Sequence, residues 1–198
     1  LEYAAELLTD GRDADALAFG RDERAFRNLL LVEQPNGDFA VTMAKQCFYD
    51  AWHHAVLQRL VDSSDARIAG IAGKALKEVT YHLRRSSEWV QRLGGGTEES
   101  RRRMLEAIPA LWRFTVELTT GSESEARLAE AGIAADPAQV GAAWLQQVAR
   151  IFQSVELPLP NAASHFYLSG RQGLHTEHLG LLLAEMQFLP RAYPDATW

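Results

Sequence analysis

Several features that mark common protein classes are scarce in this sequence. A single cysteine, Cys47, excludes an intrachain disulfide and fits a reducing cytosol. The longest strongly apolar run, around residues 179–184, is far shorter than the roughly 20 residues that span a bilayer. The formal net charge is −6, and the densest basic run, Arg101 to Arg103, is more typical of a solvated helix face than of a nucleic-acid site. We therefore expect a cytoplasmic protein without a nucleic-acid or membrane partner.

Motifs for phosphate binding and nucleophilic catalysis are also missing. Gly94-Gly95-Gly96 is not followed by Lys and Ser or Thr, so it is not a phosphate-binding loop. A Gly-x-Ser-x-Gly elbow does not occur, and Cys47 lies among core-like residues without an activating pattern. The sequence predicts no catalytic and no cofactor-binding residues.

The pattern that is present is helical along nearly the whole chain. The apolar fraction is 47%, the charged fraction is 23%, and alternating strand patterns are absent. We expect one all-α domain, residues 1–198, built as an antiparallel bundle of long helices. The helices are expected at residues 1–8, 22–32, 38–61, 66–93, 97–118 with a kink or break at Pro109, from Pro137 through Val155, and 174–189.

The helix expected at residues 38–61 has apolar side chains on two sides. One stripe contains Met43, Asp50 and Leu57, and a second surface contains Phe48 and Ala51. A helix that is apolar on two sides packs on two sides, so the sequence predicts that it is the central element of the bundle.

Three polar side chains are expected to face the bundle interior. Glu78 and His82 are four residues apart on the predicted apolar stripe of helix 66–93, and Asp50 lies in the stripe of the preceding helix. Di-iron bundle proteins aim carboxylates and Glu-x-x-His pairs inward, but here Tyr81 occupies the third position and His82 follows it. We therefore interpret Asp50, Glu78, Tyr81 and His82 as a vestigial site without metal, in which buried Glu78 and His82 satisfy each other.

A second polar string, residues 173–180, contains His175 and His178 at a spacing of three. It does not match the His-Glu-x-x-His zinc pattern. Thr176 and Glu177 suit the first turn of a helix. The favoured interpretation is a helix start that is fixed by polar contacts, with a metal site as the less favoured alternative.

Five short strings together resemble one protein family. They are residues 29–39 (LLLVEQPNGDF), 81–84 (YHLR), 111–114 (LWRF), 173–180 (GLHTEHLG) and 184–187 (AEMQ). The chain resembles, over its whole length, the C subunits of bacterial phenylacetyl-CoA epoxidases, which take part in phenylacetate degradation.

The resemblance implies a ferritin-like antiparallel helical bundle with additional C-terminal helices. It implies a non-catalytic structural subunit that pairs with a homologous catalytic A subunit and a small accessory subunit. In such complexes the A subunit holds the di-iron centre and a reductase supplies electrons. The resemblance also implies an extra N-terminal stretch with the first bundle helix and most of the second. A start at Leu1, within a predicted helix and without Met, agrees with an N-terminally incomplete domain.

The residues alone leave two other functions open. The first is an active ferritin-like di-metal oxygenase or oxidase that uses Asp50, Glu78 and His82 with ligands from the missing segment. The second is a helical binding protein with a pocket of its own. Self-association of the isolated chain is a further expectation, because a central helix with two apolar sides leaves surface to cover.

Overall fold

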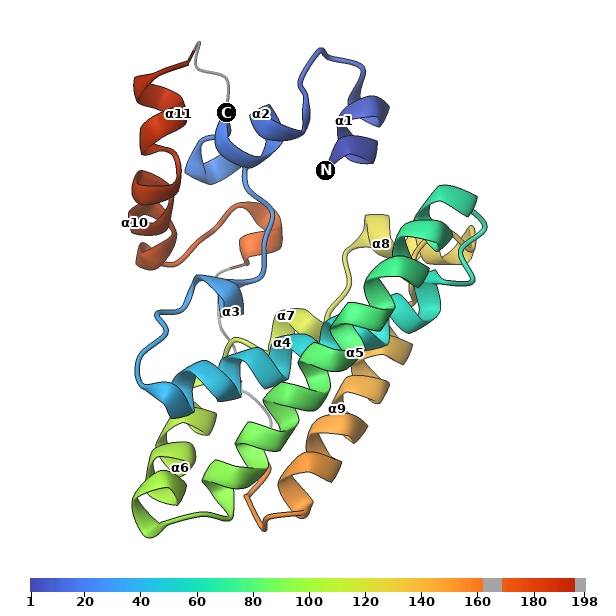
Figure 1. The fold of residues 1–198 in the computed structure, drawn as a ribbon. Helices are drawn as coiled ribbons and strands as arrows, with labels where there is room; N and C mark the ends of the chain where they lie inside the picture. Colours follow the sequence, from blue (N-terminus) through green and yellow to red (C-terminus); the bar gives the residue numbers. More distant parts are fainter. Residues whose placement is uncertain (162–168, 195–198) are drawn as a thin grey trace. The chain divides into compact units, whose positions relative to one another are not determined.

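The computed structural model describes residues 1–161 and 169–194, and the helices it contains confirm the all-α fold class (Figure 1). The chain divides into two compact units, which we describe separately. Unit 1 comprises residues 1–35 and 167–198, and unit 2 comprises residues 36–166. The sequence-based expectation of one domain stays a prediction.

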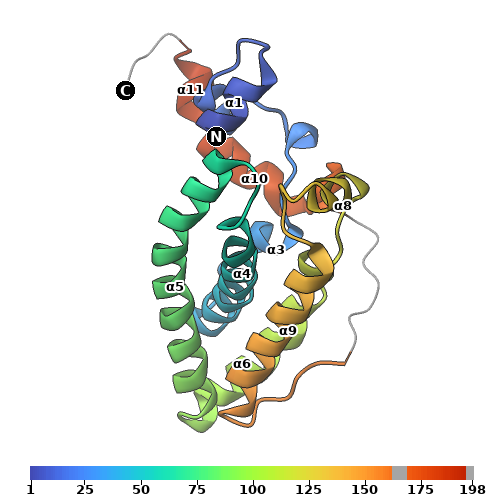
Figure 2. The same ribbon diagram turned by 90° about the vertical axis from the view of Figure 1, so that its right-hand side faces the viewer.

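Four long helices form the frame of unit 2. They are α4 (Phe39–Leu60), α5 (Ala66–Gly94), α6 (Glu98–Trp112) and α9 (Pro137–Gln153), and consecutive helices of this set run antiparallel (Figures 1 and 2). Each helix starts at a side chain that accepts a hydrogen bond from a backbone N–H of the first turn, which satisfies a donor that the helix itself leaves open. The capping residues are Asp38, Asp65, Thr97 and Asp136.

Helix α4 is the central element of unit 2, as the sequence predicts. It packs against α5, α6 and α9. Phe48 of α4 is fully buried and makes edge or tilted ring contacts with Trp112, Trp144 and Phe152. The Trp144 indole N–H donates to the backbone carbonyl of Phe48 over 3.0 Å, so the one polar atom of this ring is also satisfied.

The helix expected at residues 97–118 is divided. α6 ends three residues after Pro109, and the chain re-enters a helical turn as α7 (Val116–Thr119). A proline inside a helix removes one backbone hydrogen bond and crowds the preceding turn, but α6 continues through Pro109, so the break falls after the proline and not at it. A further helix, α8 (Glu123–Glu130), was not expected, although Ser122 and Glu125 form a complete capping box at its start.

Short helices make up unit 1. Its first segment holds α1 (Glu2–Leu8), α2 (Ala14–Phe19), the 3₁₀ turn η1 (Glu23–Ala25) and α3 (Leu30–Glu33). Its second segment holds the 3₁₀ turn η2 (Gly170–Gln172), α10 (Glu177–Met186) and α11 (Phe188–Ala192). The two segments pack together where α10 meets η1 and α3.

Two helix predictions in unit 1 were wrong in extent. The helix expected at residues 22–32 is interrupted, because Phe26 and Leu29 adopt extended backbone conformations. The helix expected at residues 174–189 begins later and divides at Gln187, and Pro190 lies inside α11 instead of ending the helix.

The basic run at residues 101–103 is used within the fold. Arg102 and Arg103 pair with Glu99 on the exposed face of α6, as expected of a solvated helix face. These two arginines lower the pKa of Glu99 to about 2. Arg101 instead donates to three backbone carbonyls, those of Gly94, Val155 and Glu156. It thereby ties the end of α5 to the segment after α9.

Among the described residues no helix is both long and apolar enough to cross a membrane.

Candidate functional site

Asp50 is a buried carboxylate of unit 2, and only 2% of the residue is exposed. Gln46 Nε2, one turn earlier on α4, donates to Asp50 Oδ1 over 2.7 Å. The Ser86 hydroxyl of α5 donates to Asp50 Oδ2 over 2.8 Å. Both carboxylate oxygens therefore accept a hydrogen bond from a neutral side chain, which offsets the cost of removing the charge from water. We call Gln46, Asp50 and Ser86 the Asp50 cluster.

The surroundings of Asp50 change the acid–base behaviour of its neighbours. Burial, and secondarily the negative charge of Asp50, raises the pKa of the Cys47 thiol to about 12. Burial lowers the pKa of His53, although Asp50 opposes this effect. Cys47 therefore stays a protonated thiol at neutral pH and packs as a small apolar side chain, as the sequence predicts.

The prediction that Glu78 and His82 are buried is wrong for this chain. The Glu78 side chain is 75% exposed and the His82 side chain 44% exposed. Their nearest charged atoms lie 3.9 Å apart, which is the long limit of an ion pair. Tyr81 is exposed as well, at 64%. Contacts between exposed charges are weak because water and salt screen them, so this pair does not organise an interior.

The error has a simple geometric cause. The buried positions of α5 are Ala72, Val79, Leu83, Ser86, Val90 and Gly94. The buried face is shifted along the sequence by one residue from the predicted face. A shift of one residue rotates a side chain by about 100° around the helix, so the two faces point in different directions. The predicted stripe followed apolar Ile68 and Ile71, but Ile71 is exposed and the small polar Ser86 is buried. The burial of Ser86 follows from its hydrogen bond to Asp50. No local sequence pattern predicts this hydrogen bond.

The structure separates Asp50, which is buried, from Glu78, Tyr81 and His82, which are exposed. A di-iron bundle needs several carboxylates and imidazoles converging on one interior point. Here both oxygens of Asp50 are engaged by Gln46 and Ser86, whereas Glu78, Tyr81 and His82 lie on the exposed face of α5. Within residues 1–161 and 169–194, no group of three or more acidic, histidine or cysteine side chains could hold a metal ion.

Another buried carboxylate, Glu33, belongs to unit 1 and was not singled out from the sequence. Asn28 Nδ2 donates to Glu33 Oε1 over 2.7 Å, and the backbone N–H and hydroxyl of Thr176 donate to Oε2 over 2.8 and 2.7 Å. The Glu33 side chain is 0% exposed and that of His175 1%. We call Asn28, Glu33, His175 and Thr176 the Glu33 cluster.

His175 completes the Glu33 cluster, and its contact with Glu33 sets the tautomer of the imidazole ring. Its Nδ1 lies 2.7 Å from Glu33 Oε1. Because a carboxylate only accepts, this nitrogen carries the hydrogen. Nε2 of the same ring is buried and has no hydrogen-bond partner among the described residues. The prediction that polar contacts fix the start of this helix is confirmed, although the partner is Glu33, 142 residues earlier in the chain.

Comparison with known proteins agrees with this architecture. The all-α helical fold is consistent with the ferritin-like class of proteins. A family model described as phenylacetic acid catabolic protein matches residues 1–198, and the chain belongs to this family. It is 52% identical over 198 residues to the C subunit of the 1,2-phenylacetyl-CoA epoxidase of Escherichia coli strain K12, a match that covers 100% of this chain and 79% of that protein.

Proposed function

We propose that this chain is a structural, non-catalytic subunit of an oxygenase that epoxidises the aromatic ring of phenylacetyl-CoA. In this proposal it pairs with a di-iron catalytic subunit, and a small accessory subunit joins the complex. Support comes from the identity of 52% to a protein that is named as a subunit of such an epoxidase. The observation that carries the non-catalytic role is the Asp50 cluster, in which neutral donors engage both oxygens of the interior carboxylate of α4.

In this proposal, neutral hydrogen-bond donors replace a metal ion beside the buried carboxylate. A buried carboxylate that no longer binds a cation needs other hydrogen-bond donors, because an unsatisfied buried charge costs several kcal/mol. Gln46 and Ser86 supply these donors from α4 and α5. A bundle with such a cluster is stable without iron and keeps the outer surfaces through which it contacts other subunits.

The test is co-expression of the full-length protein with the catalytic subunit, followed by size-exclusion chromatography and iron analysis of the complex and of each subunit alone. We expect a stable complex in which iron follows the catalytic subunit. We also expect that Glu78→Gln leaves turnover of the reconstituted complex within about twofold of wild type, because Glu78 is exposed.

Two results would contradict the proposal. About two irons bound by this subunit alone would support the active di-metal oxygenase instead. A loss of turnover by several orders of magnitude in Glu78→Gln, with the complex intact, would assign this residue to the chemistry. Glu130→Gln, at an exposed position of α8, serves as the matched control because it removes the same charge elsewhere in unit 2.

A further inference from the structure

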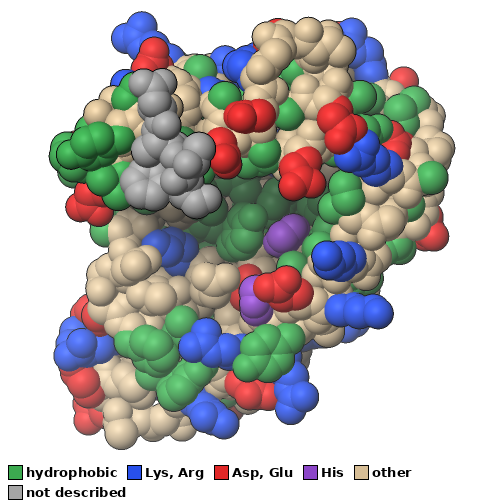
Figure 3. Space-filling view, turned by 45° about the horizontal axis from the view of Figure 1, so that its top comes forward, with side chains coloured by type: hydrophobic (Ala, Val, Ile, Leu, Met, Phe, Trp, Pro, Cys, Tyr) green, Lys and Arg blue, Asp and Glu red, His purple; other side chains and the backbone are tan. Residues whose placement is uncertain are grey.

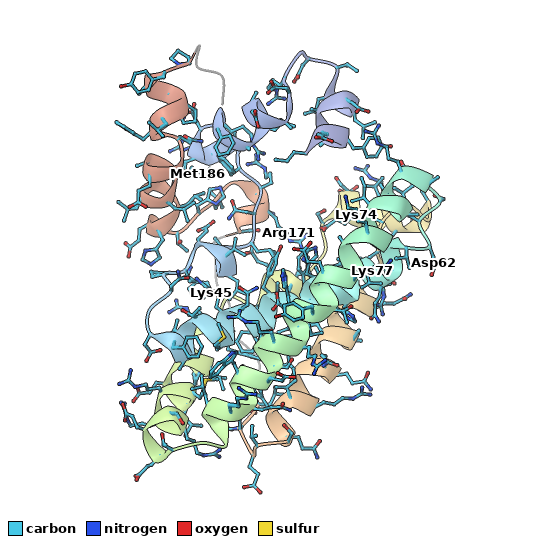
Figure 4. The ribbon with its side chains drawn as sticks, in the orientation of Figure 1. Lys45, Asp62, Lys74, Lys77, Arg171 and Met186 are labelled. Atoms are coloured by element: carbon cyan, nitrogen blue, oxygen red, sulfur yellow. The ribbon has the colours of Figure 1, made fainter. Side chains whose placement is uncertain are left out.

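A groove of about 670 Å³ lies within unit 1, between α2 and the α10–α11 segment. Its floor is apolar and includes Phe19, Met186, Leu189 and Tyr193. Met186, labelled in Figure 4, lies at the end of α10. We call this feature the α2–α11 groove.

The apolar side of the groove continues as a stripe along the C-terminal helices. Leu182 and Met186 are four residues apart on α10, Leu189 lies on α11, and Tyr193 directly follows the end of α11, so the stripe passes from one short helix to the next. All four are exposed, Tyr193 to 61%. An occupant that covers this stripe is elongated and apolar along one side, as an amphipathic helix is.

The rim of the groove is acidic. Asp15 of α2 and Glu185 of α10 line it, and neither has a partner within residues 1–161 and 169–194. The one lining cation, Arg191, is already engaged, because it pairs with Asp22 over 2.9 Å and donates to Gln187 over 3.0 Å. The charge left over at the rim is therefore negative.

The whole of unit 1 shares this bias. Its described residues include ten acidic and six basic side chains. The face of the molecule drawn in Figure 3 carries acidic, basic and hydrophobic side chains. Opposite charges at the edge of an apolar contact fix the register of a partner and exclude wrong ones.

We propose that the α2–α11 groove docks a basic amphipathic helix of the catalytic subunit. This inference rests on the proposed function and gives it a contact surface. The apolar side of the incoming helix covers the stripe from Leu182 to Tyr193. Its lysine or arginine side chains, on either edge, pair with Asp15 and Glu185.

The experiment compares three forms of the full-length protein for binding to the catalytic subunit by titration in low and high salt. The first is wild type, and the second carries Asp15→Lys and Glu185→Lys. The third is a matched control, Asp62→Lys with Glu130→Lys, which makes the same charge change at exposed positions of unit 2. Asp62 lies at the turn between α4 and α5 (Figure 4).

We expect the groove variant to bind at least roughly tenfold more weakly than wild type and to lose most of its salt dependence. The control should bind within about twofold of wild type. A photo-crosslinking residue at position 193 gives a second readout that does not depend on a disruptive charge change. It is expected to capture a segment of the catalytic subunit rich in lysine or arginine with apolar side chains at helical spacing.

The outcomes separate the two proposals. If wild type forms no complex, the proposed function fails and the groove assignment fails with it. If wild type binds but the groove variant binds equally well, the groove assignment alone is overturned. A crosslink from position 193 to a second copy of this chain, in place of the catalytic subunit, would likewise overturn it.

Discussion

Units 1 and 2 of this chain are stabilised by different kinds of interaction. Unit 2 has four long helices around Phe48 and its ring contacts, so apolar burial and packing hold it together. Unit 1 has only short helices, which gain little on their own. Its two chain segments meet at the fully buried Glu33 carboxylate. Where helices are short, a buried, hydrogen-bonded polar cluster contributes what a continuous apolar core contributes elsewhere.

The comparison also has an energetic side. When an apolar side chain is truncated, the loss in free energy of unfolding increases with the volume that is removed. When one partner of a buried polar cluster is removed, donors are left buried without an acceptor, and the whole cluster is destabilised. Substitutions in the two units should therefore differ in the size of the effect and in how local it is.

The largest effect is expected in unit 2. Phe48→Ala removes the ring that contacts Trp112, Trp144 and Phe152 and leaves a cavity, which should lower the free energy of unfolding by about 3–5 kcal/mol. Urea denaturation followed by tryptophan fluorescence measures the change. Phe39→Ala is the control, because Phe39 is exposed at 46%. A loss of under about 1 kcal/mol for Phe48→Ala would contradict the central position of this ring.

An intermediate effect is expected in unit 1. Glu33→Gln replaces an acceptor-only group by an amide, so that an amide N–H₂ faces donors of the cluster, and should cost about 1–3 kcal/mol. Hydrogen exchange should show faster exchange of the Thr176 amide with little change in unit 2. Glu177→Gln removes an exposed charge from the same helix start and should leave this amide protected. Equal exchange in both variants would disprove the role of Glu33.

A smaller effect concerns pH. Burial lowers the pKa of His53 and His54 in the folded chain below the ordinary value of 6.5. At pH values between the lowered pKa of the folded chain and 6.5, the unfolded chain binds protons that the folded chain does not. The free energy of unfolding is therefore full above about pH 6.5 and falls as the pH decreases. Thermal denaturation from pH 7.5 to 5.5 should show a declining midpoint, and His53→Gln should flatten this decline. Parallel profiles for wild type and variant would count against the burial of His53.

The smallest effect is expected for the pair that the sequence placed in the interior. Glu78→Gln should change the free energy of unfolding by no more than about 0.5 kcal/mol, because exposed ion pairs contribute little. Asp50→Asn sharpens the contrast, since it disturbs a buried carboxylate with engaged oxygens and should cost about 1–3 kcal/mol. If Glu78→Gln cost more than Asp50→Asn, the assignment of the two residues to surface and interior would be reversed.

Local signals in the sequence predicted most of the frame of unit 2. The caps at Asp38, Asp65, Thr97 and Asp136 mark helix starts that the structure confirms. The two apolar sides of α4 also predicted its central place. These features could be read because each depends on residues within a few positions of one another. The capping box of Ser122 and Glu125 was equally local, and its motif could have revealed α8.

The interior polar contacts could not be predicted in the same way. Helix α5 carries small and apolar residues on more than one side, so its pattern did not decide between the face of Glu78 and the face of Ser86. The Glu33 cluster joins residues 142 positions apart, and neither end indicates the other. The extended backbone at Phe26 and Leu29, on either side of Asn28, interrupts a stretch that reads as helical in isolation.

The distance along the chain between Glu33 and its partners has a consequence for biosynthesis. Residues 36–161, which include the helices of unit 2, leave the ribosome before His175 and Thr176 do. During that interval the Glu33 carboxylate lacks the donors of His175 and Thr176, which have not yet been made, and needs water in their place. Unit 1 is therefore completed last, after translation has passed residue 176. A ribosome stalled before that point would carry a nascent chain in which residues 1–35 lack the second segment of unit 1.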